Sequence, residues 1–435
     1  MTNDNSQLEA SDEMLGSILC HINSFFSFPA IADEAETKGG LKIVSDDGDF
    51  SAQLGGRIHF DTYIFDKDLE DPVNTTDFRR VRLTMKGNLW KWNYKLERDF
   101  ADDGAGGLRD VYLATKFSTG KLTIGNFKPS RSINELTSSN DLVLMERAFT
   151  SAAGIYSGRG RQQGIDWHKH WCCYTFGFTL FNLRDPGDPR NSGFGAATRL
   201  TWAPINDALS TVHLGVYRSY EKANQNSPDI VAEVAYAGRR GPEQLIAITP
   251  GGSDNFFGEF GDDEFFLGDG GGRVNTTGFE LAATYGPLFG QAEYAYGHFT
   301  GKIYLAELTY EEFFGLPPSF FCDPISGCFI GGQDVHAWYI MGSWAITGQH
   351  KPYDSKIGVF KSIKPSPPEG AWEVAARYTA IENRDFRQLR ASNFTLGVNY
   401  YFNPKVRVMM NITLGDDDFT GDKTNQFAIR LQGVW

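Results

Sequence analysis

Apolar and polar residues alternate with a period of two through most of the chain from residue 49 onward. Along the segment 392–402, one parity holds Phe394, Leu396, Val398, Tyr400 and Phe402, whereas the other includes Thr395, Gly397 and Asn399. Because successive side chains of a strand point to opposite faces, this period predicts β-strands with two chemically different faces. No run of about 18 consecutive apolar residues occurs in this part of the chain, so no membrane-spanning helix is predicted there.

The alternation divides into candidate strands, of which the segment 229–238 has the weakest pattern. Single-chain bacterial barrels contain an even number of strands, so we leave this segment out and predict sixteen. The sixteen are 50–65, 78–89, 92–100, 108–117, 120–127, 160–168, 171–182, 193–203, 210–220, 275–285, 288–298, 334–347, 371–381, 392–402, 405–414 and 426–435. No internal repeat and no Pro/Ser-rich linker divides them, which predicts a single barrel domain.

A transmembrane barrel and a soluble β-sandwich both alternate, and the chemistry of the two faces separates them. Aromatic residues make up 14% of the chain, and Trp202, Trp372 and Trp435 are among those on the apolar face near strand ends. Aromatic girdles and a polar interior are typical of barrels in lipid, whereas the dry core of a sandwich does not accept charged side chains. The sequence therefore predicts an all-β, 16-stranded antiparallel transmembrane β-barrel in the bacterial outer membrane.

The charge balance narrows the range of partners. With 41 basic and 54 acidic residues the formal net charge is -13, which disfavours a general nucleic-acid binder.

The five cysteines include no Cys-x-x-Cys pair, which excludes a structural zinc module. We expect no cofactor, no metal and no enzymatic site. A barrel enzyme would need Ser, His and Asn or Asp clustered on the outward face, and no such cluster is found.

The first residues have the features of an export signal. An uncharged, mostly apolar run from Met14 to Ala32 ends in Ala30-Ile31-Ala32, a small-x-small pattern typical of a cleavage site. The expected organisation is a signal peptide or leader at 1–32, a short segment at 33–48 and the barrel at 49–435.

Several segments resemble, in the same order, a known family, the phosphate-selective porins O and P. They are Asp77-Phe78-Arg79-Arg80-Val81-Arg82-Leu83, Tyr94-Lys95-Leu96-Glu97-Arg98-Asp99-Phe100, Gly125-Asn126-Phe127-Lys128-Pro129, Glu135-Leu136-Thr137-Ser138-Ser139, Met145-Glu146-Arg147-Ala148, 370–378 and 396–404. The resemblance implies a homotrimeric, 16-stranded channel whose third loop folds inward and whose Arg and Lys side chains guide anions. One departure is that Asn140 and Asp141 follow Ser139, where phosphate-selective members often carry a basic residue.

The expected function is a passive, water-filled channel for small anions, with inorganic phosphate or polyphosphate as the permeant. Two alternatives remain at this point: a general diffusion porin without phosphate selectivity, and a barrel of another class, either an enzyme or a structural and adhesion barrel. The expected partners are small anions, outer-membrane lipid and lipopolysaccharide, and two further copies of the chain. The acidic run 258–269 is one candidate for contacts with lipopolysaccharide through divalent cations.

Strand parity selects the candidate pore-lining cations. With Val81 and Leu83 outward, the inward positions of the same strand hold Arg80, Arg82 and Lys86. The long segment 128–150 has its own apolar residues and is identified by resemblance as the constriction loop. The full set of candidate pore-lining and anion-binding residues is Arg79, Arg80, Arg82, Lys86, Lys128, Arg131, Arg147, Arg199 and Arg377. The alternative is that these cations only pair with interior carboxylates.

Cys322 and Cys328 enclose a Pro- and Gly-containing loop. In an oxidising compartment so short a spacing predicts a hairpin disulfide, with two free thiols as the alternative.

Overall fold

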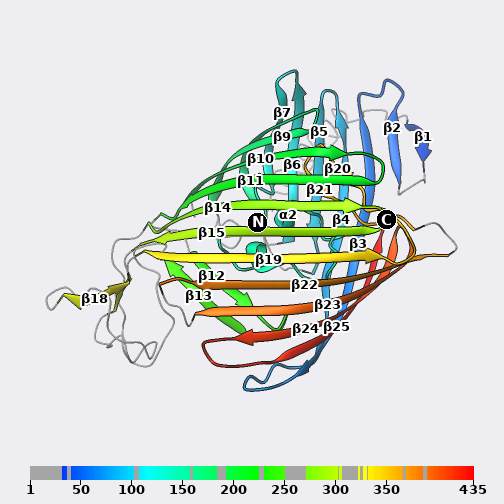
Figure 1. Ribbon diagram of the computed structural model, residues 1–435. Helices are drawn as coiled ribbons and strands as arrows, with labels where there is room; N and C mark the ends of the chain where they lie inside the picture. The colour runs from blue at the N-terminus through cyan, green and yellow to red at the C-terminus, as the bar shows by residue number, and fades with distance from the viewer. Residues whose placement is uncertain are drawn as a thin grey trace, which may run out of the picture.

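A closed antiparallel barrel forms most of the computed structural model, which describes residues 32–36, 41–101, 107–156, 160–183, 193–224, 230–249, 271–301, 303–305, 322–323, 327–330, 332–365, 369–385 and 389–435. Each barrel strand pairs with its neighbour in the chain, and the last strand pairs with the first, which closes the sheet (Figure 1). Within the described residues the sixteen barrel strands are β3 (Ser51–Asp66), β4 (Thr75–Leu89), β5 (Trp92–Asp99), β6 (Leu108–Phe117), β7 (Gly120–Phe127), β8 (Gln162–Trp171), β9 (Tyr174–Leu183), β10 (Gly193–Asn206), β11 (Ser210–Lys222), β14 (Arg273–Tyr285), β15 (Leu288–Thr300), β19 (Gln333–Ala345), β22 (Ala371–Asn383), β23 (Arg390–Asn403), β24 (Val406–Asp417) and β25 (Asn425–Val434).

The prediction of sixteen barrel strands is confirmed, and all sixteen predicted segments are barrel strands. The segment left out, 229–238, contains β12 (Ile230–Ala235), which pairs with β13 (Glu243–Thr249) in a separate two-stranded sheet. The second strand of this hairpin, β13, lies outside all of the predicted segments. Other short elements are β1 (Ala32–Glu36), β2 (Lys42–Ser45), β16 (Ile303–Leu305), β17 (Cys322–Asp323), β18 (Gly327–Ile330), β20 (Tyr353–Asp354), β21 (Val359–Phe360), α2 (Ile133–Leu136) and α3 (Phe149–Ala152).

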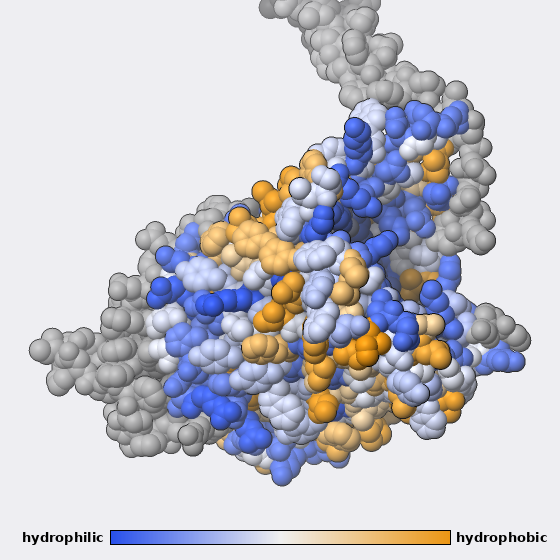
Figure 2. Space-filling model, turned by 45° about the horizontal axis from the view of Figure 1, so that its top comes forward, coloured by the Kyte–Doolittle hydropathy of each residue, from blue (hydrophilic) through white to orange (hydrophobic). Residues whose placement is uncertain are grey.

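The barrel wall presents apolar side chains outward and polar side chains inward. Leu281 and Ile340 are more than half exposed on the outside, whereas Arg430 and Glu97 are almost fully buried inside. Figure 2 shows apolar residues across the middle of the visible face and hydrophilic residues toward its ends. None of the described helices is both long enough and apolar enough to cross a membrane.

Short turns such as Trp171–Tyr174 lie at one end of the barrel, together with the C-terminus, and the longer connections lie at the other end. In outer-membrane barrels the short turns are periplasmic and the longer loops extracellular. The segment 346–365, which contains β20 and β21, is the long exception at the periplasmic end.

The lumen is filled by segments that fold inward and pack on an apolar patch of the inner wall. The patch carries Phe299 and Val335 from β15 and β19, and against it pack Tyr156 and, from the β12–β13 hairpin, Ile246. Burial of apolar surface against this patch stabilises the inward position of these segments. A wall that was polar throughout would not provide that stabilisation.

The predicted disulfide joins two strands that the structure pairs. Cys322 in β17 and Cys328 in β18 are Cα partners in an antiparallel pair. Their side chains lie outside the described residues, so the bond stays a prediction. We expect peptide mapping without reduction to recover the two cysteines in one linked peptide. Cys172 and Cys173, which are free, should be alkylated in the same sample and report that thiols were accessible. Recovery of alkylated Cys322 and Cys328 before reduction would contradict the prediction.

Candidate functional site

The segment 128–161, which we call the lumen loop, crosses the interior of the barrel. Near its start, Ser130 donates a hydrogen bond to Asp166 on β8 at 2.7 Å. Further along, the amide of Phe149 donates to Thr379 on β22 at 3.1 Å. Because these contacts lie on different walls, the loop spans the lumen rather than covering its mouth, as the resemblance implied.

Strand side chains hold the loop by its backbone carbonyls. Arg377 donates to the carbonyl of Glu146 at 2.8 Å, and Arg430 donates to that of Met145 at 2.7 Å. Arg407 does the same for Leu142 at 3.0 Å. Cationic donors that reach from the wall therefore position the loop as well as contributing charge.

Beside the loop lies the outer cavity, a space of about 1040 Å³ on the extracellular side. Thirteen basic side chains line it, and only five carboxylates do. The basic residues are Arg57, Arg79, Arg80, Arg82, Lys95, Arg109, Lys128, Arg147, Arg161, Arg239, Arg240, Lys361 and Arg377, and the acidic ones are Asp110, Glu135, Glu146, Glu233 and Glu243. The cavity is strongly positive inside a chain whose total charge is negative.

A β-bulge brings two consecutive arginines to this cavity. The register between β3 and β4 shifts by one residue, so that His59 faces Arg80, Phe60 faces Phe78, and Arg79 is the extra residue. A bulge lets neighbouring side chains leave strict alternation, which is why both Arg79 and Arg80 line the cavity.

The two arginines differ in their partners. Arg79 is held by Glu146 of the lumen loop, with Nε and Nη2 at 2.9 and 3.1 Å from its two oxygens. Nε and Nη1 of Arg80 have no hydrogen-bond partner among the described residues, although the side chain is buried. A buried guanidinium with unused donors is suited to bind an anion that enters the cavity.

Two further arginines of the outer cavity form ion pairs with carboxylates of β5 and β6. Arg82 pairs with Asp99 at 2.7 Å and with Glu97 at 3.0 Å. Arg161 of the lumen loop pairs with Asp110 at 2.7 Å. Arg82 thus has a structural role in addition to lining the cavity, and paired interior charges, the alternative considered from sequence, account for part of the set.

The inner cavity, about 620 Å³, lies on the periplasmic side and shares part of its lining with the outer cavity. Five residues line both spaces: Tyr112, Phe127, Lys128, Leu136 and Ile357. We call this set of residues the constriction, because it lies where the two cavities meet. Four of its members are apolar or aromatic, and Lys128 carries its charge.

Lys128 is turned toward the backbone of the lumen loop. Its Nζ donates to the carbonyl of Glu135, and the carbonyl of Thr137 lies at 3.4 Å. Burial, with Arg147 nearby, lowers the pKa of Lys128 well below its ordinary value. Burial alone would raise the pKa of Glu135, but Lys128 and Arg147 bring it down to about 2. Glu135 is therefore ionised at any physiological pH.

The structure brings together six of the nine candidate pore-lining cations in the outer cavity: Arg79, Arg80, Arg82, Lys128, Arg147 and Arg377. The other three lie elsewhere. Arg131 is fully buried behind the loop, where it pairs with Glu221 and its guanidinium carbon lies 4.0 Å from the ring centroid of Tyr156. Arg199 pairs with Glu280 and lines the inner cavity. Lys86 is exposed and lines neither cavity.

Sequence reasoning missed six cations of the outer cavity: two on the β12–β13 turn, one on the periplasmic segment, and Arg57, Arg109 and Arg161. Arg239 and Arg240 both contact Asp77 of β4, at 3.0 and 3.1 Å, and both line the outer cavity. Lys361 also lines it and lies 3.8 Å from Asp141. Apolar residues at inward positions, such as Val274 and Phe299, were the available signal that further segments pack inside.

A closed barrel with an apolar exterior, a loop across its lumen and a charged cavity on each side of a constriction is the architecture of an outer-membrane porin, a channel rather than an enzyme. Residues 52–435 match the family described as "Phosphate-selective porin O and P", and the chain belongs to that family. The resemblance inferred from sequence is confirmed.

Comparisons with individual proteins agree with this assignment. Porin O of Pseudomonas aeruginosa is 25% identical over 441 residues, which cover 92% of each chain. Among solved structures, OmpT of Vibrio cholerae has a TM-score of 0.53 at 12% identity and covers 90% of this chain and 98% of its own. An anion-selective porin from Comamonas acidovorans has a TM-score of 0.50 at 11% identity, with 89% and 100% covered. The solved structures support the fold alone.

Proposed function

We propose that this porin is a passive channel for small anions and that inorganic phosphate is its preferred permeant. The observation that carries the proposal is the excess of basic over acidic side chains in the outer cavity, which leads to a constriction with a lysine. Low-dielectric walls confine the field of such charges, so a few cations act more strongly in a narrow lumen than on an open surface.

The side chains around Arg80 supply the chemistry that phosphate needs. Arginine stays charged and presents several N–H donors, which replace water around tetrahedral oxyanions. Donors of Arg80 are unused, and Arg147 beside the constriction also has a donor without a partner among the described residues. A channel also requires that binding be weak enough for release, and the carboxylates that share the cavity serve that purpose.

Phosphate is favoured over general diffusion by the family and by the supply of cations. The matching family is described as phosphate-selective, and Porin O is one of its members by name. Asn140 and Asp141 follow the Thr-Ser-Ser triplet, where phosphate-selective members often carry a basic residue. Lys361 lies beside Asp141 and adds a cation to the same cavity.

The functional unit is proposed to be a homotrimer, as the family resemblance implies. Support comes from the wall formed by the short strands β5 to β8, which exposes Leu96, Leu113, Ile124 and Ile165 outward. A related fold, OmpT of Vibrio cholerae, is known in a trimer form.

The test is ion selectivity in planar lipid bilayers. In a KCl gradient we expect a reversal potential that reports preference for chloride over potassium, because the lumen is positive. Added inorganic phosphate should then reduce the chloride current at lower concentration than added sulfate, since phosphate occupies the cavity. Arg80→Gln should weaken this block, whereas Lys67→Gln on an exposed loop should leave it unchanged. Cation preference in the wild type, or equal block by phosphate and sulfate, would contradict the proposal.

A further inference from the structure

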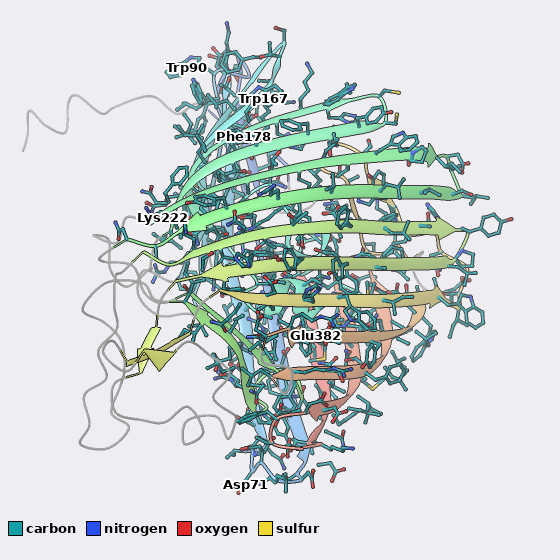
Figure 3. The ribbon with its side chains drawn as sticks, turned by 60° about the vertical axis from the view of Figure 1, so that its left-hand side comes forward. Asp71, Trp90, Trp167, Phe178, Lys222 and Glu382 are labelled. Atoms are coloured by element: carbon teal, nitrogen blue, oxygen red, sulfur yellow. The ribbon has the colours of Figure 1, made fainter. Side chains whose placement is uncertain are left out.

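Three cations lie together on the outside of the barrel, where β11 and β14 reach their extracellular ends. Lys222 and Arg273 face each other across the strand pair, and Arg218 lies on the same outward face further down β11. All three are exposed, and Figure 3 shows Lys222 at the end of the wall where the strands run into the loops. We call this group the rim site.

The rim site has an excess of positive charge. Like charges directly opposite each other in a strand pair are unfavourable, and an anion between Lys222 and Arg273 would relieve that repulsion. None of the three cations forms an ion pair with the described residues. Other cations at the same end of the barrel are paired: Arg384 with Glu382 at 2.6 Å and Arg390 with Asp418 at 3.5 Å. Among the described residues, the rim site therefore differs from these neighbours in having cations without an ion-pair partner.

The side chains below the rim site show where it lies relative to the lipid. Descending the outward face, the opposed pairs are Lys222 with Arg273, Tyr220 with Asn275, Arg218 with Thr277, Val216 with Phe279 and Leu214 with Leu281. From Tyr285 at the periplasmic end to Thr277, the strand rises by roughly 20 Å along the barrel axis, given ~3.4 Å per residue and a tilt of ~40°. The apolar band of such barrels is about 25 Å tall, so Lys222 and Arg273 lie at the level of the outer-leaflet headgroups.

We propose that the rim site binds a phosphate group of the lipopolysaccharide that forms the outer leaflet. Arg273 and Arg218 can each contact phosphate oxygens through two N–H donors, and Lys222 adds a point charge. Tyr220 and Asn275, between the cations, offer a hydroxyl and an amide to the sugar that carries the phosphate. The exposed Val216 and Phe279 below them contact the acyl chains of the same lipid. This surface lies outside the pore, so its role is independent of anion conduction.

The experiment measures retention of lipid A by the detergent-purified porin in native mass spectrometry. The probes are lipid A with two phosphates and the same lipid after enzymatic removal of both. We expect wild type to retain the phosphorylated lipid and to retain about tenfold less of the dephosphorylated one, as expected for lost charge-assisted contacts. Lys222→Gln with Arg273→Gln should lower retention of the phosphorylated lipid to the level of the dephosphorylated one.

The matched control is Arg384→Gln with Arg390→Gln, which removes two paired cations from the same end of the barrel. This control should keep wild-type retention. Single-channel conductance of the Lys222/Arg273 variant should equal that of wild type, which shows that the barrel is folded and that the channel proposal is untouched. Equal retention of both lipids, equal loss in both double variants, or displacement of the lipid by millimolar inorganic phosphate would overturn the assignment.

Discussion

The Lys128→Glu channel is expected to pass anions about a hundredfold more slowly than wild type and to prefer cations. Lys128 supplies the charge of the constriction, where the other lining residues are apolar or aromatic. Two unit charges ~6 Å apart interact by about 3 kcal/mol at an effective dielectric of 20, and about 3 kcal/mol in a barrier corresponds to about a hundredfold in rate. The measurement is the permeability ratio and conductance of single channels in planar bilayers.

The control for this variant is Lys169→Glu, which reverses a charge on the inner cavity at a side chain that donates to the carbonyl of Ser118 and not to the constriction. We expect a smaller change in selectivity there, because water in the wider space screens the charge. If Lys128→Glu and Lys169→Glu behave alike, the constriction has been placed wrongly.

The pH dependence of wild type gives a second test of Lys128. Because burial lowers its pKa well below the ordinary value, the side chain loses its proton at a lower pH than an exposed lysine would. Anion preference should therefore fall as pH rises, at a lower pH than the titration of an exposed lysine would give. Lys128→Arg, which keeps its charge, should abolish this fall.

Replacement of residues 230–249 by a Gly/Ser segment of equal length is expected to raise single-channel conductance severalfold and to weaken phosphate block. The β12–β13 hairpin occupies the lumen, where the amide of Glu233 donates to Ala153 of the lumen loop at 2.9 Å. Wall residues hold it as well: Asn383 donates to the carbonyl of Ile246 at 2.8 Å and Asn393 to that of Tyr236 at 3.0 Å. Without it, the open cross-section increases and Arg239 and Arg240 are lost.

A double variant, Arg239→Gln with Arg240→Gln, separates the two effects. It removes the charges but keeps the hairpin, so we expect weaker phosphate block with little change in conductance. An unchanged conductance after the full replacement would show that the hairpin does not obstruct the ion path.

The fold could be predicted from the sequence because each barrel strand has lipid on one side. Contact with hydrocarbon requires an apolar residue at every second position, and that requirement is visible in segments such as 392–402 without knowledge of the rest of the chain. The weak alternation of 229–238 has the corresponding cause: β12 lies inside the lumen and has no lipid-facing side. Its Ile230, Ala232 and Val234 pack in the apolar cluster, whereas Glu233 and Ala235 line the outer cavity.

The site could be predicted only in part, because position inside a lumen depends on contacts distant in sequence. Parity placed Arg80 and Arg82 correctly, but Arg79 reaches the cavity through a bulge, which alternation does not reveal. Arg131 is a cation in the predicted constriction loop, which is why it was a candidate. In the structure it forms an ion pair with Glu221 and is buried away from the cavities. Those assignments follow from the docking of the lumen loop and not from local pattern.

The anchoring of the lumen loop by its carbonyls determines when during biogenesis the pore is completed. Arg377, Arg407 and Arg430 belong to β22, β24 and β25, which follow the loop by more than 200 residues in the chain. Contacts so distant in sequence form late, because the intervening chain must first be ordered. These carbonyl anchors therefore form only once β22, β24 and β25 are in place, close to the step in which the last strand joins β3. In an incompletely assembled chain the loop lacks these three anchors, so its final position in the lumen is reached together with barrel closure.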